Sequence, residues 1–214
     1  MASNRRLPVY LLLDTSGSMK GEPIESLRVG LQSLVSSLRQ DPHALESVYL
    51  SVITFDREVK ELCALTSLED FQCPQITCPE SGPTHLGAAL EMLCRVTDRD
   101  IIRSSADRKG DWRPILFVMT DGSPSDIQIF EQAIPQVKSK GFASIIACAA
   151  GPKAKREPLE KFANHVATLD QMDGATFASF FRWVSSTIAG GNVSMGVTAE
   201  LPLPPPPKEI HVVV

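Results

Sequence analysis

The chain has 214 residues, 43% of them hydrophobic and 21% charged, which is the balance of an ordinary globular domain with a sizeable core. Its net charge of -4 excludes a general attraction to nucleic acid or to an anionic membrane surface. No long apolar stretch follows the amino terminus, so we expect neither a signal peptide nor membrane insertion. The five cysteines are then expected to be reduced thiols in a cytoplasmic protein.

The first predicted element is a strand at residues 9–13, an unbroken apolar run of the kind that is buried on both faces. It ends at Asp14, and Ser16 and Ser18 follow at alternate positions, with Gly17 between them to let the backbone bend. Open α/β sheets bind ligands at the carboxyl ends of their strands, so we expect a site here. Hard oxygen ligands with few charges suit Mg2+ or Mn2+ better than zinc or copper.

The rest of the chain alternates helical and strand patterns. Apolar and β-branched runs predict further strands at residues 48–55, 59–65, 115–119, 143–149 and 166–169. Apolar residues at helical spacing predict helices starting near Glu22, Pro83, Ser125, Leu159 and Phe177, with Ser125 as a helix cap and Asp41-Pro42 as a helix end. A short polar turn joins the second and third strands into an antiparallel hairpin. The order predicts an α/β fold, a doubly wound, mostly parallel six-stranded sheet with one antiparallel edge strand and helices on both faces.

The composition changes near Gly190, which divides the chain into a domain at residues 1–190 and a proline-rich tail at residues 191–214. Residues 201–207 predict a polyproline II segment, and the closing valines favour a strand. We expect the tail to serve binding rather than folding. The alternative is that it docks on its own domain and seals an edge strand.

Two later stretches fall on the same edge of the predicted sheet as the Asp14 loop. They are Thr84 and the turn Thr120-Asp121-Gly122. With the first loop they supply two carboxylates and three hydroxyls, which is enough for an octahedral metal site completed by water. The predicted metal ligands are thus Asp14, Ser16, Ser18, Thr84 and Asp121.

This set resembles the von Willebrand factor A domain family and its metal-ion-dependent adhesion site. The family's D-x-S-x-S motif matches Asp14, Ser16 and Ser18, its isolated threonine matches Thr84, and the aspartate of its T-D-G motif matches Asp121. The resemblance spans residues 7–189. Within the family, the chain is most similar to the TerY-type proteins of bacterial tellurium-resistance operons, in its length, in the sequence from Asp14 to Met19 and in its proline-rich ending.

The resemblance implies a non-enzymatic, metal-dependent protein-interaction module. Ser16 and Ser18 would bind the metal directly, and Asp14 would hold bound water and the serines. Thr84 and Asp121 would exchange direct for water-mediated contact. An Asp or Glu of a protein partner would complete the metal's shell. The partners implied are other tellurium-resistance proteins or a kinase and phosphatase pair.

Four alternatives remain open. The chain could be a metal-dependent phosphohydrolase with Asp14 as nucleophile, although Ser16 stands where haloacid-dehalogenase chemistry wants a second aspartate. The first loop could simply cap a helix. Cys73 and Cys78, with Cys63 and His85, could bind zinc, although the usual paired short spacing is missing. The thiols could also act on tellurium oxyanions, but no C-x-x-C motif is present.

Overall fold

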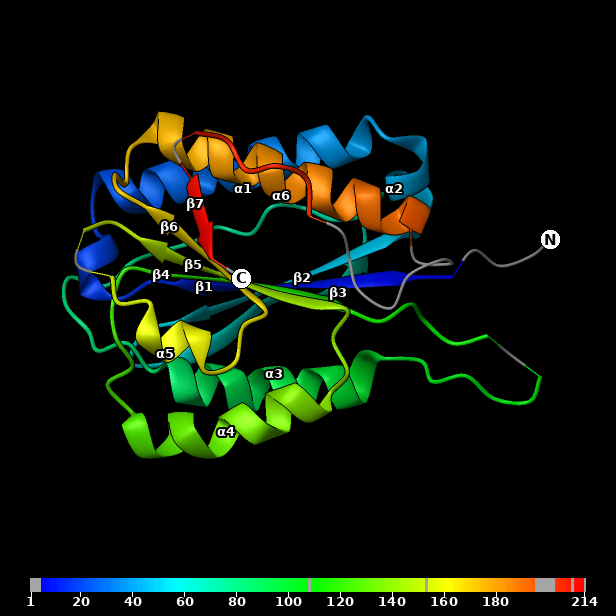
Figure 1. The fold of residues 1–214 in the computed structure, drawn as a ribbon, viewed down its shortest axis with the longest axis horizontal. Helices are drawn as coiled ribbons and strands as arrows, with labels where there is room; N and C mark the ends of the chain where they lie inside the picture. Colours follow the sequence, from blue (N-terminus) through cyan, green and yellow to red (C-terminus); the bar gives the residue numbers. More distant parts are fainter. Residues whose placement is uncertain (1–4, 108, 153, 195–202, 209, 214) are drawn as a thin grey trace.

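The computed structural model describes residues 5–107, 109–152, 154–194, 203–208 and 210–213, with the backbone alone for residues 191–194 and 213. A seven-stranded sheet in the order β3-β2-β1-β4-β5-β6-β7 forms the middle layer. Helices α1, α2 and α6 cover one face, and α3, α4 and α5 cover the other (Figure 1). The predicted fold class is confirmed, with one strand more than the six predicted.

The strands are β1 (Leu7–Asp14), β2 (Val48–Phe55), β3 (Val59–Ser67), β4 (Ile115–Thr120), β5 (Ser144–Ala150), β6 (His165–Leu169) and β7 (Ile210–Val213). The helices are the short 3-10 helix η1 (Gly17–Met19), α1 (Glu22–Arg39), α2 (Pro42–Ser47), α3 (Leu86–Asp100), α4 (Ile127–Ser139), α5 (Glu157–Glu160) and α6 (Gly174–Ser194). The two edge strands, β3 and β7, run antiparallel to their neighbours, and the other pairs are parallel.

Strand β1 lies at the centre of the sheet, between β2 and β4. All eight of its residues are buried because both of its faces are covered. Successive side chains alternate between the faces, so Leu11 joins the core under α1 and α6 while Tyr10 and Leu12 join the core over α3 and α4. The chain leaves β1 toward β2 on one side and later returns on the other side with β4, so the carboxyl end of β1 is the point where the strand order reverses and where such sheets bind ligands.

The segment after α1 differs from the prediction. Asp41-Pro42 does end α1, but it also begins a second short helix, α2, that the sequence analysis missed. The Asp41 carboxylate accepts hydrogen bonds from the backbone N–H groups of His43 and Ala44, and Pro42 occupies the first turn. An acidic residue followed by proline is therefore a helix start here as well as a stop.

The described part of the tail packs on its own domain, so the expectation that it serves binding rather than folding is wrong for these residues. Strand β7 pairs with β6, Leu169 opposite Ile210, and the Ile210 side chain is buried. Before it, the Pro204 carbonyl accepts a hydrogen bond of 2.9 Å from Trp183 Nε1 on α6. The physical reason is the edge of β6, whose backbone groups would otherwise stay unpaired.

Helix α6 continues through Gly190 and Gly191 to Ser194. In the described part of the chain, no helix combines the length and the apolar character that crossing a membrane requires.

Candidate metal centre

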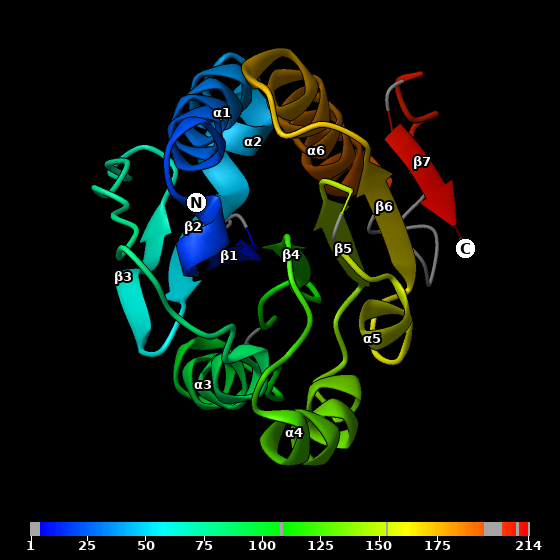
Figure 2. The ribbon, with the colours of Figure 1, turned by 90° about the vertical axis from the view of Figure 1, so that its left-hand side faces the viewer.

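The candidate site lies at the carboxyl edge of the sheet, which Figure 2 views from the side where β1 and β4 end. Parallel pairing sets Leu13 opposite Met119, so the next residues, Asp14 and Thr120, leave the two strands side by side. Thr84 reaches the same edge from the loop that precedes α3. The topology therefore gathers the three predicted stretches in one place.

Asp14 is fully buried, and both of its carboxylate oxygens are engaged by protein groups. Its Oδ1 accepts the Ser16 N–H at 2.7 Å, and its Oδ2 accepts the Thr120 hydroxyl at 2.5 Å. Burial raises the pKa of Asp14 to about 6, because the charged form loses hydration, although the hydrogen bonds from Thr120 and Ser16 act in the opposite direction. Asp14 thus holds the loop that carries the serines.

Ser18 Oγ contacts two other oxygen atoms that could bind a metal. Ser16 Oγ and Ser18 Oγ are 3.2 Å apart, and Ser18 Oγ donates to Asp121 Oδ1 at 2.9 Å. Ser16 and Asp121 are buried while Ser18 is exposed. The fifth predicted ligand lies close by, since a Cβ placed on Gly122 would stand 3.0 Å from Thr84 Oγ1. All five predicted residues are therefore near each other.

The donor spacing fits a small octahedral cation. Metal–oxygen bonds of 2.0–2.1 Å place adjacent octahedral ligands about 2.9 Å apart. The Ser16–Ser18 and Ser18–Asp121 oxygen distances of 3.2 and 2.9 Å are close to that edge length. The donor atoms are hydroxyl and carboxylate oxygens, the ligands that Mg2+ and Mn2+ prefer. The residues present thus fit such a metal.

Three positioning residues were missed by the sequence analysis: Thr120, which holds Asp14, and the pair Ser125 and Asp126. Ser125 does not cap α4 as predicted. Its Oγ donates to the Thr84 carbonyl and accepts the Thr84 N–H, each at 2.9 Å. A serine before a helix resembles a cap in the sequence, and only the folded chain shows that its partner lies 41 residues away.

Asp126 performs the capping for another helix. Its carboxylate accepts the N–H groups of Gly87 at 3.0 Å and Ala88 at 2.8 Å, in the first turn of α3. A carboxylate at a helix N-terminus is favoured both by these donors and by the helix dipole. The loop that carries Asp121 is therefore fastened to the segment that carries Thr84.

Gly17 is required for a reason other than the predicted bend. The positive-φ glycines of the described chain are Gly21, Gly141 and Gly151, and Gly17 is not among them. Instead, a Cβ on Gly17 would lie 2.7 Å from Ser81 Cα and 3.0 Å from Gly82 N. The backbone at Ser81 thus packs directly on residues 14–18, which we call the metal loop, and only glycine leaves room for it.

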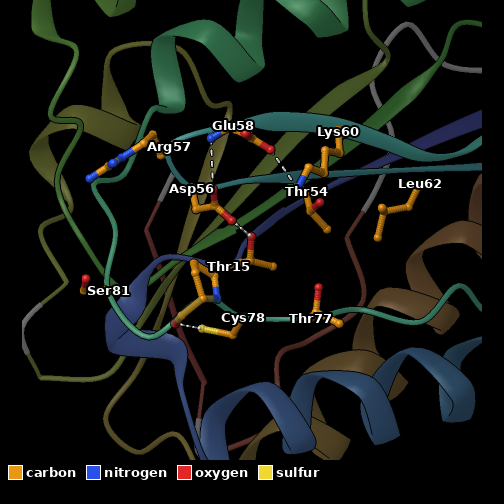
Figure 3. Close-up of a pocket in the computed structure, with 11 residues that line it drawn as sticks. Thr15, Thr54, Asp56, Arg57, Glu58, Lys60, Leu62, Thr77, Cys78 and Ser81 are labelled. Carbon is orange, nitrogen blue, oxygen red and sulfur yellow. Dashed lines mark hydrogen bonds and ion pairs between the residues drawn. The ribbon is translucent and has the colours of Figure 1, made fainter.

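A pocket of about 460 Å3 opens beside the metal loop (Figure 3). Thr15 stands in its wall and donates to Asp56 Oδ2 at 2.9 Å, and the Cys78 thiol donates to the Ser16 carbonyl at 3.1 Å. Glu58 and Lys60 also line it and form an ion pair with each other. Most of the residues that line the pocket are polar, and Thr15, between Asp14 and Ser16, forms part of its wall.

The cysteines do not assemble a competing site. All five are free thiols, and no three His, Cys, Asp or Glu side chains are grouped as metal ligands within the described ranges. Burial raises the pKa of Cys73 and Cys78, which disfavours the thiolate that zinc binds. The zinc alternative therefore has no ligand group in this part of the chain.

Comparison with known proteins agrees with this geometry. The profile of the von Willebrand factor type A domain family matches residues 9–179. The chain belongs to this family. Domains of the family are typically metal-dependent protein-interaction modules. A search of curated proteins finds no match.

Several solved structures share the fold. A von Willebrand factor type A protein from Catenulispora acidiphila is 17% identical with a TM-score of 0.69, over 87% of this chain and 43% of that one. The pilus adhesin SpaC from Lactobacillus rhamnosus GG is 11% identical with a TM-score of 0.69, over 87% and 31%. Proximal thread matrix protein 1 from the mussel byssus, solved with a zinc-occupied MIDAS motif, is 17% identical with a TM-score of 0.58, over 87% and 48%. The chain spans less than half the length of each of these proteins.

Proposed function

We propose that this von Willebrand factor type A domain is a non-enzymatic, metal-dependent protein-interaction module. The observation that carries the proposal is the contact between Ser16 Oγ, Ser18 Oγ and Asp121 Oδ1 at the carboxyl edge of the sheet. These atoms, with Thr84 Oγ1 beside Gly122, would hold a divalent cation, and Asp14 would position the serines. A bound cation supplies an electrophilic centre that attracts an anion.

The partner group that completes such a centre is a carboxylate. Three of the metal's ligands here are neutral hydroxyls, so the protein leaves part of the cation's charge uncompensated. An Asp or Glu side chain of a protein partner supplies both the missing charge and a further oxygen ligand. We propose Mg2+ or Mn2+ as the metal, because the donor set consists of oxygen atoms.

The phosphohydrolase alternative is weakened by the state of Asp14. A nucleophilic carboxylate needs an oxygen that can reach the substrate phosphorus. Asp14 is buried, and its two oxygens accept hydrogen bonds from Ser16 and Thr120. The same contacts suit a residue that orients a loop.

The cellular setting is proposed from the sequence resemblance alone. The TerY-like sequence of the first loop and the proline-rich ending support a role in a bacterial tellurium-resistance or related stress system, in the cytoplasm. The partners would then be other tellurium-resistance proteins or a kinase and phosphatase pair.

The test is calorimetric titration of the wild type, Ser16→Ala and Asp121→Ala with Mg2+, Mn2+ and Zn2+, with Cys73→Ala as the control. Removing one ligand from a small oxygen site should lower Mg2+ or Mn2+ affinity at least about tenfold, while circular dichroism stays native because the loop lies outside the core. Cys73→Ala should bind as the wild type does. Tight zinc binding that survives in Ser16→Ala and Asp121→Ala but is lost in Cys73→Ala would overturn the proposal.

Carboxylate capture is tested separately with Mn2+ as the probe. A partner carboxylate that enters the metal's shell displaces bound water, so a glutamate-containing peptide should lower the water-proton relaxation of the Mn2+-loaded domain. The matched glutamine peptide should have no effect. Equal responses to the two peptides would show that the metal does not select an acidic side chain.

A further inference from the structure

Four of the five candidate metal ligands are recessed and Ser18 is exposed, which restricts the directions from which a group can reach the site. Asp14 and Ser16 are at most 1% exposed, and Thr84 and Asp121 are each 8% exposed. The backbone at Ser81 packs directly on the metal loop. A carboxylate at the end of a narrow, projecting segment is suited to reach such a site.

This chain carries a segment of that shape at its opposite end. The loop between α3 and β4 projects beyond the sheet on the side away from η1 and the metal loop (Figure 1). Its base is well built: the Arg5 guanidinium lies 3.6 Å from the centre of the Trp112 ring and donates to the Gly110 carbonyl at 2.8 Å. Across the loop, the Asp111 N–H donates to the Ile102 carbonyl at 2.8 Å. These contacts hold the base of the projecting loop against the domain.

The tip of the loop bears one exposed carboxylate, Asp107. The other acidic residue of the loop, Asp111, is buried in an ion pair with Arg6. The aspartates at the end of α3 are also paired, Asp98 with Lys140 and Asp100 with Arg99. Asp107 is exposed at a bend and has no ion pair with any residue that the structure describes. It is the carboxylate of this region that is left for a partner.

We propose that the protein partner of the metal site is a second copy of this chain, which inserts Asp107 as the acidic ligand. This inference rests on the proposed function, because it needs a metal that accepts a carboxylate. One acidic side chain beside the site agrees with it, in a pocket that Arg57 and Lys60 also line. Lys109, two residues after Asp107, is exposed, and the pocket beside the metal loop contains Asp56, whose oxygens accept from Thr15 and the Glu58 N–H. Lys109 of the inserted loop would meet Asp56 there.

The placement of the two surfaces sets the form of the assembly. The loop and the metal site lie at opposite ends of the sheet, so Asp107 does not reach the site of its own chain (Figure 1). The contact between copies is then heterologous, loop to metal site, and leaves one unused loop and one unused site at the two ends. Such a contact adds further copies head to tail, and it stops when either surface is removed.

The experiment is sedimentation velocity of the wild type, Asp107→Asn and Ser16→Ala, each with Mn2+ or with EDTA. Mn2+ should drive the wild type into species larger than one chain, EDTA should reverse this, and each variant alone should stay monomeric. Mixing the two variants should restore association but stop at two chains, because one supplies an intact site and the other an intact loop. Glu69→Gln removes a different exposed carboxylate and should assemble as the wild type does.

Calorimetry with Mn2+ on the same samples separates the two claims. Wild type that binds Mn2+ but stays monomeric overturns this inference and leaves the proposed function intact, as does association that persists in Asp107→Asn or in EDTA. Wild type that binds no Mn2+ overturns the proposed function itself. If Ser16→Ala is found unfolded by circular dichroism, Asp121→Ala takes its place in the mixture.

Discussion

Asp14 influences the candidate site because it is buried, which fixes its hydrogen bonds and raises its pKa. It has no contact with solvent, and its carboxylate joins the two loops by accepting from Ser16 and Thr120. Burial holds its pKa at about 6, so a proton competes with a metal cation for this region just below neutral pH. The residue is therefore both a positioning group and a source of pH dependence.

We predict that Mn2+ affinity falls about tenfold between pH 7 and pH 5. The Asp14 carboxylate, with a pKa of about 6, is ionised at the upper pH and mostly protonated at the lower one, and metal binding requires the ionised form. Calorimetric titration at pH 7, 6 and 5 checks this. Equal affinities at pH 7 and pH 5 would mean that Asp14 does not titrate in this range or does not influence the metal.

The metal-free domain should show the opposite trend in stability. The pKa of Asp14 is higher in the folded chain than its ordinary value near 4, so the folded state binds more protons than the unfolded state between about pH 4 and pH 6. The free energy of unfolding should therefore decrease by up to about 3 kcal/mol as pH rises through that window. Urea unfolding in EDTA measures it, and saturating Mn2+ should remove the trend.

At the scale of single residues, the sequence predicted the candidate metal ligands but not the residues that hold them in place. The five oxygen-bearing residues stand at the ends of predicted elements, so their common edge followed from the order of strands and helices. Thr120, Ser125 and Asp126 act on residues far away in the chain, at separations of 38 to 106 positions. Such contacts leave no local pattern. That the donors hold a metal stays a prediction.

Among the elements, η1 and the loop at Ser81 meet in a contact that leaves no room for a side chain on Gly17. Gly17 touches the backbone of Ser81 and Gly82 so closely that a methyl group has no space. Neither neighbour is a flexible side chain, so the loops themselves must move to relieve a clash.

We predict that Gly17→Ala lowers the free energy of unfolding by about 1–3 kcal/mol and weakens metal binding. The added methyl group would push the Ser81 backbone away and shift the serines with it. Chemical denaturation and Mn2+ calorimetry check the two effects. The control is Gly190→Ala, which places a methyl group in open space on α6 and should gain up to about 1 kcal/mol from helix propensity. If Gly17→Ala changes the free energy of unfolding no more unfavourably than Gly190→Ala does, the close contact with Ser81 does not contribute to stability as predicted.

The tail offers a second prediction for an element. Deleting residues 203–214 should lower the melting temperature by about 10 °C, because it exposes the site of Ile210 and removes the bond from Trp183. Mn2+ affinity should stay unchanged, since β7 is separated from β1 by three strands. Ile210→Ala in the full chain should give part of the same loss. An unchanged melting temperature with lost partner binding would restore the tail to the role of a ligand.

The elements that the sequence predicted best were those with strong apolar runs. Strands β1, β2, β4 and β5 are buried on both faces, so their runs are continuous and easily recognised. Helix α2 was missed because Asp41-Pro42 is typical both of a helix end and of a helix start. Strand β7 was uncertain because four β-prone residues after prolines do not indicate which edge they pair with.

The whole molecule is an α/β sandwich whose two ends differ in role. The carboxyl edge of the sheet gathers the oxygen atoms of the candidate site, and the opposite end carries the projecting loop that contains Asp107 (Figure 1). Strand β1 connects the two because it runs from the base of that loop, where Arg6 pairs with Asp111, to Asp14 at the metal loop. The fold thus presents the oxygen atoms of the candidate metal site at one end and an exposed acidic group at the other.

The most direct test of the central claim is anomalous X-ray diffraction from crystals of the wild-type domain grown with Mn2+. The account predicts one strong anomalous peak within about 2.1 Å of Ser16 Oγ and Ser18 Oγ, with Thr84 and Asp121 in its first or second coordination shell. It predicts no such peak in crystals of Ser16→Ala. A peak at the cysteines, or an empty carboxyl edge in crystals that hold Mn2+ elsewhere, would contradict it.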